Sequence, residues 1–189
     1  MLFNSYEFIL LFLPVTFLVF FAIARSGREA AIAWLVIASL FFYGWWNPSY
    51  LILILLSMVI NFGFGEFISR AHEHRRTAWA KISLSLGVML NLGVLAYFKY
   101  AGFFFDSINA LAGTSVDLGQ IVLPLAISFF TFQQIAYLVD AYKWITQEYR
   151  FSHYALFVTF FPQLIAGPIV HHKEMLPQFM HWDTLRPRR

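Results

Sequence analysis

The chain has 189 residues, of which 60% are hydrophobic, 20% aromatic and only 12% charged, and its net charge is +3. A typical soluble domain has about 25% charged residues and lacks long apolar runs, so this composition indicates an all-α, polytopic membrane protein. The modest charge argues against a nucleic-acid partner, and the absence of cysteine excludes disulfides, thiolate metal sites and a cysteine nucleophile within these residues.

Three apolar runs of near-membrane length open the chain. The first, Tyr6 to Ala24, approaches the ~20 residues that cross a hydrocarbon core. We interpret it as a retained span, because a signal peptide has basic residues before its apolar core and this segment has none. The second, Ala30 to Trp46, follows a charged loop, Arg25 to Glu29, and ends in aromatic residues suited to the membrane interface. A turn at Asn47-Pro48 then leads into the third run, Tyr50 to Ile68.

Two more spans are predicted in the second half, which makes about five transmembrane helices. A polar loop, Ser69 to Lys81, precedes the fourth run, Ile82 to Phe98. The less hydrophobic stretch from Tyr100 to Gln120 is interpreted as an interfacial helix followed by a loop. The fifth run extends from Ile121 to Val139.

The last apolar segment, residues 151–170, is interrupted by residues that a simple anchor helix does not need. Pro162, Gln163, Gly167 and Pro168 fall within it. In lipid, irregular backbone is tolerated only where protein or a water-filled cavity satisfies the freed polar groups. The segment therefore predicts a broken, re-entrant element that lines an internal cavity.

The distribution of Lys and Arg predicts the orientation. With the N-terminus outside, the outer loops hold only Lys99 and the inner loops hold eight basic residues, a positive-inside bias. The same rule favours a last segment that returns to the inner side over one that crosses. We expect one membrane domain over residues 1–180 and a polar tail over 181–189. The inner basic residues are Arg25, Arg28, Arg70, Arg75, Arg76, Lys81, Lys143 and Arg150.

Several amide side chains lie at membrane depth, where an unpaired polar group is costly. Gln133 and Gln134 belong to the fifth run. Our first interpretation of this pair is interhelical hydrogen bonding, and a cavity or substrate role is the alternative. Asn61 and Asn91 are lone amides in the third and fourth runs, and for both we expect hydrogen bonds between helices.

Ionisable residues near the ends of the last two segments are the remaining candidates. Asp140 closes the fifth run, where the helix dipole disfavours an acid, so a cationic partner such as Lys143 is expected. The pair His171-His172 follows the Gly-Pro break and could supply a general base for acylation of a hydroxyl. Adjacent histidines point to different sides of a helix and no further ligands are suitably spaced, so no metal site is expected.

Four stretches carry a family resemblance, and they occur together and in order. They are Met1 to Pro14, Ser39 to Tyr50, Leu123 to Tyr142, and Pro-Gln-Leu-Ile-Ala-Gly-Pro at residues 162–168. In this combination they resemble the membrane-bound O-acyltransferase family, in its alginate O-acetylation branch. The resemblance implies a ring of helices around a central funnel in the bacterial inner membrane. It also implies transfer of an acyl group, usually acetyl, to hydroxyls of a cell-surface polysaccharide such as alginate.

The resemblance further implies an intracellular acyl donor such as acetyl-CoA, no bound cofactor, and extracytoplasmic acetylation accessory proteins as partners. The family's catalytic histidine lies in a later Trp-x-x-Trp-His-Ile-Ser stretch, so we expect it downstream of Arg189, and His171 is the candidate within this chain. The chain is thus interpreted as the N-terminal part of an O-acyltransferase, which would need its C-terminal half or a partner subunit. The residues expected to shape or support the cavity are Pro162, Gln163, Gly167, Pro168, Gln133, Gln134 and Asp140.

Two other functions fit parts of the pattern. Broken helices at membrane depth also mark the binding sites of transporters and channels, although the acids of this chain lie towards the ends of its apolar runs. A non-catalytic remnant of an acyltransferase is the second alternative, and it should be rapidly degraded because its cavity-lining polar groups would lack partners.

Overall fold

The computed structural model describes residues 3–112, 122–145 and 150–166, and within these ranges the chain forms helices and no strand. This confirms the all-α prediction. In chain order the elements are the π-helix η1 (Glu7–Phe12), α1 (Leu13–Ala24), α2 (Arg28–Trp46), α3 (Ser49–Glu73), α4 (Thr77–Ala112), α5 (Ile127–Tyr142), α6 (Phe151–Thr159) and α7 (Phe161–Ala166).

Three helical segments of the described chain are long and apolar enough to span a membrane, which confirms a membrane protein. They are Glu7–Ala24, Ser49–Glu73 and Thr77–Leu111. Helix α2 has 19 residues but begins with Arg28 and Glu29. Helix α5 has 16 residues, which gives a length of about 24 Å, somewhat less than the ~30 Å hydrocarbon core.

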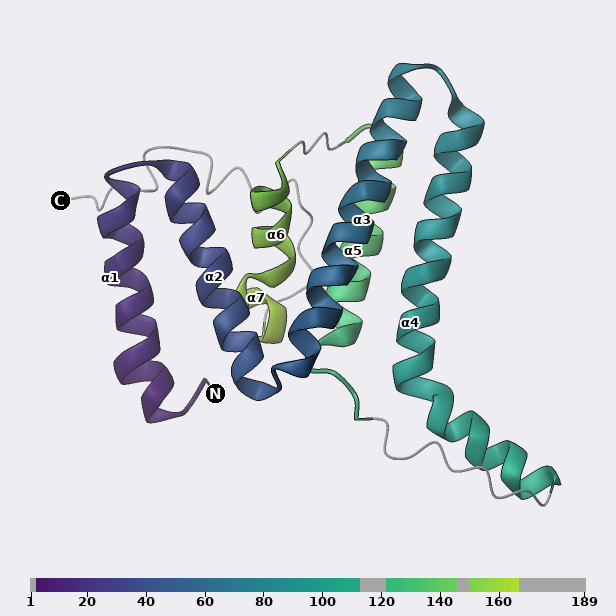
Figure 1. Cartoon of the computed structure of the whole chain (residues 1–189), viewed down its shortest axis with the longest axis horizontal. Helices are drawn as coiled ribbons and strands as arrows, with labels where there is room; N and C mark the ends of the chain where they lie inside the picture. Colours follow the sequence, from purple (N-terminus) through teal and green to yellow (C-terminus); the bar gives the residue numbers. More distant parts are fainter. Residues whose placement is uncertain (1–2, 113–121, 146–149, 167–189) are drawn as a thin grey trace.

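The helices form two groups with the broken segment between them (Figure 1). An antiparallel pair, α1 and α2, lies on one side, and α3, α4 and α5 pack together on the other. Helices α6 and α7 lie between the groups, where α6 contacts α2, α3 and α5. The α1–α2 turn, the α3–α4 turn and the start of α6 share one end of the bundle (Figure 1). Most of the basic residues predicted to face one side of the membrane belong to these segments.

Two predicted boundaries around the third and fourth spans were wrong. The expected polar loop from Ser69 to Lys81 is reduced to a turn at residues 74–76, because α3 continues to Glu73 and α4 begins at Thr77. The expected interfacial helix is the last part of α4, which runs unbroken to Ala112 and bends away from the bundle (Figure 1). Hydropathy falls in both places, but Arg, Glu and Ala around the α3–α4 turn and Ala and Leu at the end of α4 favour helix, so the helices extend beyond the apolar runs.

The fifth helix begins later than predicted. Residues 122–126 are not helical, and α5 starts at Ile127 rather than Ile121. Pro124 cannot occupy a helix interior, and Ala126 has a left-handed backbone conformation with φ of 57°. Residues 122–126 are therefore apolar without being helical, and Val122 and Leu123 are exposed.

Ion pairs and a hydrogen bond connect α6 and the residue before it to α2, at the basic end of the bundle. The Glu29 carboxylate of α2 forms an ion pair with Arg150, and its Oε1 lies 3.2 Å from Nε2 of the buried His153. The Ser152 hydroxyl donates to the other carboxylate oxygen at 3.4 Å. Partial burial opposes ionisation of Glu29, but the hydrogen bonds and charges of His153 and Arg150 outweigh it and lower its pKa. The ionised carboxylate therefore stabilises the position of α6.

Replacement of this carboxylate should make the protein less stable in a pH-dependent way. Because the pKa of Glu29 is lower in the folded state, its contribution is present above the ordinary value of 4.5 and is lost as the pH falls through the lowered pKa. We expect Glu29→Gln to lower the free energy of unfolding by about 1 kcal/mol at pH 7. The value is modest because the carboxylate is partly exposed.

The measurement is detergent-induced unfolding of wild type and Glu29→Gln between pH 7 and pH 3. The difference between the two proteins should shrink below pH 4.5. Glu66→Gln is the matched control, since Glu66 pairs only with Arg70 on the surface of its own helix among the described residues. A difference that stays constant over this pH range would contradict the assignment.

Candidate functional site

The predicted break in the last segment lies at Phe160. Helix α6 ends at Thr159 and α7 begins at Phe161, while Phe160 has φ of −50° and ψ of 106°, outside the helical region. Pro162 explains the position, because proline has no N–H to donate to the carbonyl of residue 158 and its ring would clash with that carbonyl. The Phe160 carbonyl accepts the N–H groups of Gln163 and Leu164, at 3.0 and 2.9 Å, and so begins the new helix.

The backbone freed by the break is satisfied by protein, as expected for irregular structure in a membrane. The Phe161 N–H donates to the Ser39 hydroxyl of α2 at 3.3 Å, in a buried position. The Phe161 ring contacts a phenylalanine cluster from η1 and α2, with ring centroids 5.2 Å from Phe12 and 5.4 Å from Phe42. Backbone and side chain therefore hold the break against α2 and the N-terminal helix.

A small apolar cavity of about 170 Å³ adjoins the break. It lies between the break and the first two helices, and Gln133, Gln134 and Gln163 are not among the residues that line it. The cavity is therefore suited to a short apolar group and offers few polar contacts. Its lining residues are Leu13, Thr16, Phe17, Phe20, Leu35, Phe160, Phe161 and Pro162.

A buried amide cluster joins α3, α4 and α5. Asn61 Nδ2 donates to Gln134 Oε1 at 2.7 Å and to Asn91 Oδ1 at 3.2 Å, and Asn91 Nδ2 donates back to Asn61 Oδ1 at 2.5 Å. The Ser57 hydroxyl donates to the same Gln134 oxygen at 2.5 Å. The expected interhelical hydrogen bonds of Asn61 and Asn91 are confirmed. Gln134 links α5 to both, and its side chain is fully buried.

Other buried polar atoms have no hydrogen-bond partner among the described residues. They include Gln133 Oε1 and Gln134 Nε2 on α5, Gln163 Nε2 on α7, His72 Nε2 on α3, and the hydroxyl oxygens of Tyr43 on α2 and Tyr154 on α6. Buried polar groups are nearly always hydrogen-bonded, so a set without partners requires an explanation such as water or a ligand. These groups belong to α6 and α7 and to helices that contact them.

The predicted site residues divide between described and undescribed parts of the chain. Gln133, Gln134 and Asp140 are buried on α5, and Pro162 and Gln163 lie on α7, which packs against α5. Gly167, Pro168 and His171 lie outside the described residues. Within the described ranges no cluster of three histidine or acidic side chains could hold a metal ion.

Three polar residues with clear structural roles were not singled out from the sequence. Ser39 accepts the N–H at the break, Ser57 donates to Gln134, and Glu29 fastens α6 to α2. The sequence could have indicated the two serines as candidates for buried hydrogen bonds, since each places a hydroxyl within an apolar run. Their partners lie 122 and 77 residues away in sequence, so the pairing is a matter of tertiary structure.

Comparison with curated proteins finds clear relatives over nearly the whole chain. The chain is 42% identical to the peptidoglycan O-acetyltransferase of Helicobacter pylori, over 95% of this chain and 38% of that protein. It is 40% identical to the probable alginate O-acetylase AlgI of Pseudomonas aeruginosa, over 96% of this chain and 35% of that protein. It is also 38% identical to the probable alginate O-acetylase AlgI of Azotobacter vinelandii, over 96% of this chain and 36% of that protein.

The chain therefore spans little more than a third of the length of these curated relatives. No family model matches it, and no solved structure does.

Proposed function

We propose that this chain belongs to the membrane-bound O-acyltransferase family, in its alginate O-acetylation branch, and that it forms part of a membrane enzyme that acetylates hydroxyls of a cell-surface polysaccharide such as alginate. The observation that carries the proposal is the similarity of 95% of the chain to peptidoglycan and alginate O-acetyltransferases at about 40% identity. Since the chain spans only part of those proteins, the rest of the enzyme comes from a C-terminal half or a partner subunit.

The broken segment is the proposed contribution of this chain to the site. Pro162 ends the preceding helix, and Gln163 lies in the first turn of α7, which begins at Phe161 and packs against α5. The proposed segment, whose backbone is irregular at Phe160, also includes Gly167 and Pro168. Such backbone survives in a membrane where it lines a cavity. The buried atoms without partners on Gln133 and Gln163 are available to bind a polar substrate or water, and the apolar cavity beside Phe161 is of a size for an acyl group.

The remaining parts of the proposal concern donor, topology and catalysis. The acyl donor is an intracellular thioester such as acetyl-CoA, and the basic end of the bundle faces the cytoplasm of a bacterial inner membrane, with the N-terminus outside. Asp140 supports the cavity from the cytoplasmic end of α5. The catalytic histidine lies beyond residue 189 in the complete enzyme, and His171 is the alternative base within this chain. Extracytoplasmic acetylation accessory proteins receive or pass on the acetyl group.

The test is to change the broken segment in a complete relative. At the positions corresponding to Gln163 and Gly167, the changes Gln163→Ala and Gly167→Leu should each lower polysaccharide acetylation by about tenfold, the effect of about 1.4 kcal/mol of lost transition-state stabilisation. Protein abundance in the membrane should not change. The measurements are the ester-bound acetate of the isolated polysaccharide and an immunoblot of the membrane fraction.

A glycine on the outer surface provides the control for this experiment. A side chain at Gly102 meets no atom within 4 Å, so Gly102→Leu should retain acetylation. Acetylation at the wild-type level in both Gln163→Ala and Gly167→Leu would disprove the role of the broken segment.

A further inference from the structure

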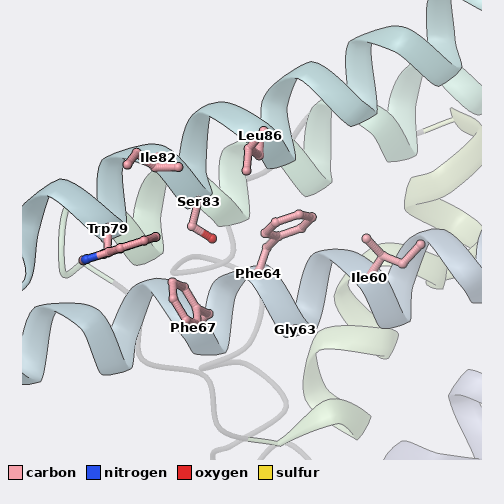
Figure 2. Close-up of a pocket in the computed structure, with 8 residues that line it drawn as sticks. All are labelled: Ile60, Gly63, Phe64, Phe67, Trp79, Ile82, Ser83 and Leu86. Carbon is pink, nitrogen blue, oxygen red and sulfur yellow. The ribbon is translucent and has the colours of Figure 1, made fainter.

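An apolar groove of about 500 Å³ runs between α3 and α4, away from the broken segment. Figure 2 shows the two helices facing each other across it, with side chains of both pointing into the gap. This volume falls within the range of about 300–1,000 Å³ that is usual for small-molecule sites. The groove is lined by Ile60, Gly63, Phe64, Phe67, Trp79, Ile82, Ser83 and Leu86.

Two small residues, Gly63 on α3 and Ser83 on α4, leave space between the larger side chains that line the groove. A Cβ at Gly63 would meet no atom within 4 Å, so the space beside this residue is open. Ser83 faces the groove from α4 (Figure 2). Phe67 is 50% and Trp79 57% exposed, so the walls face outwards, towards lipid in a membrane. A ligand can therefore enter sideways from the bilayer.

A second cavity, of about 410 Å³, adjoins the groove at the α3–α4 turn and shares Phe67 and Trp79 with it. Its other lining residues are Arg70, Ala71, His74 and Arg76. Arg70 also pairs with Glu66, whereas Arg76 makes no ion pair with any residue that the structure describes. The apolar groove thus opens onto a polar mouth that contains two arginines.

The charges around this mouth have a positive balance. Four cations, Arg70, Arg75, Arg76 and Lys81, lie at this end of α3 and α4 together with two carboxylates, Glu66 and Glu73. Trp79, at the junction of groove and mouth, is a residue type enriched at the membrane–water interface. The apolar part therefore lies at the depth of acyl chains and the basic part at the depth of lipid headgroups.

We infer that the groove and its mouth form a binding site for an acidic phospholipid. One acyl chain lies along Gly63, Ser83 and the aromatic walls, and the phosphate is bound by Arg70 and Arg76. Basic pockets between transmembrane helices are known to bind anionic headgroups, and each arginine near a membrane surface is worth about 1 kcal/mol towards an anionic lipid. The site is separate from the broken segment, so the inference does not depend on the proposed acetylation.

The test measures phospholipid retained by the purified protein in detergent with equal amounts of dioleoyl phosphatidylglycerol and dioleoyl phosphatidylcholine, by native mass spectrometry. Wild type should retain phosphatidylglycerol preferentially. Arg76→Gln should lower the preference about fivefold, the equivalent of about 1 kcal/mol, and Gly63→Leu should abolish retention because leucine fills the groove. Glycerophosphate without acyl chains should not displace the lipid.

Two matched variants control for charge and for side-chain volume. Arg25→Gln removes an exposed cation at the same end of the bundle, and Gly93→Leu adds the same side chain at another glycine with open space around it. Both should bind as wild type does. Equal retention of the two lipids by wild type, or unchanged retention by Gly63→Leu, would overturn the inference. Photo-crosslinking from Ile82 to protein rather than lipid in native membranes would also overturn it, because the groove would then be a helix-packing surface.

Discussion

A Gly65→Ala variant is expected to lose about 2–3 kcal/mol of its free energy of unfolding, because the added methyl group has no space at the contact between α3 and α5. A Cβ at Gly65 would lie 2.6 Å from Cζ of Tyr137 and closer still to its hydroxyl oxygen. Tyr137 cannot move aside easily, since it is buried and its ring centroid lies 4.4 Å from that of Tyr154 on α6. The methyl group would therefore push α3 away from α5 and α6.

The neighbouring glycine gives a control on the same helix. Gly63→Ala adds the same methyl group where nothing lies within 4 Å, so it should leave stability unchanged or raise it by up to about 1 kcal/mol through helix propensity. The measurement is unfolding of the purified protein in mixed micelles by titration with sodium dodecyl sulfate, followed by circular dichroism. Equal stability of the two variants would show that Gly65 is not needed for close packing.

An Asn61→Leu variant is expected to lose about 2–3 kcal/mol of its free energy of unfolding, because Asn61 is the central member of the amide cluster. Its loss leaves Asn91 without the two hydrogen bonds that join them and takes one donor from Gln134. Both partners are buried, at 4% and 0% exposure, so water cannot replace the lost bonds. The cost arises from unsatisfied groups rather than from lost volume, since leucine has as many side-chain heavy atoms as asparagine and leaves no cavity.

A double-mutant cycle separates these causes. In Asn61→Leu/Asn91→Leu both ends of the reciprocal pair are apolar, so the double variant should be more stable than the sum of the single costs predicts, by about 1 kcal/mol. Ser107→Ala is the control, since its hydroxyl bonds within its own exposed helix end and its loss should cost less than about 0.5 kcal/mol. Additive costs in the cycle would mean that the two amides act independently.

Much of the fold could be predicted because each membrane segment must by itself be long, apolar and helical. Apolar runs correspond to α1, α2, α3, α4 and α5, since a helix in lipid must satisfy its own backbone. The break near Pro162 was also predictable, because the chemistry of proline is local. Helix ends were less predictable. The α3–α4 turn and the end of α4 lie in less apolar sequence that favours helix as well as loop, so hydropathy ended both helices too early and began α4 too late.

The sequence by itself thus determined the class of protein, the approximate positions of its apolar helices, the break near Pro162 and the resemblance to O-acyltransferases. Each depends on local composition or on a motif that is contiguous in the chain. Only the tertiary structure decided which polar groups meet: Asn61 with Asn91 and Gln134, Ser39 with the Phe161 N–H, and Glu29 with Arg150. Helix periodicity indicates a face but not the partner that covers it, and these partners lie 30 to 122 residues apart.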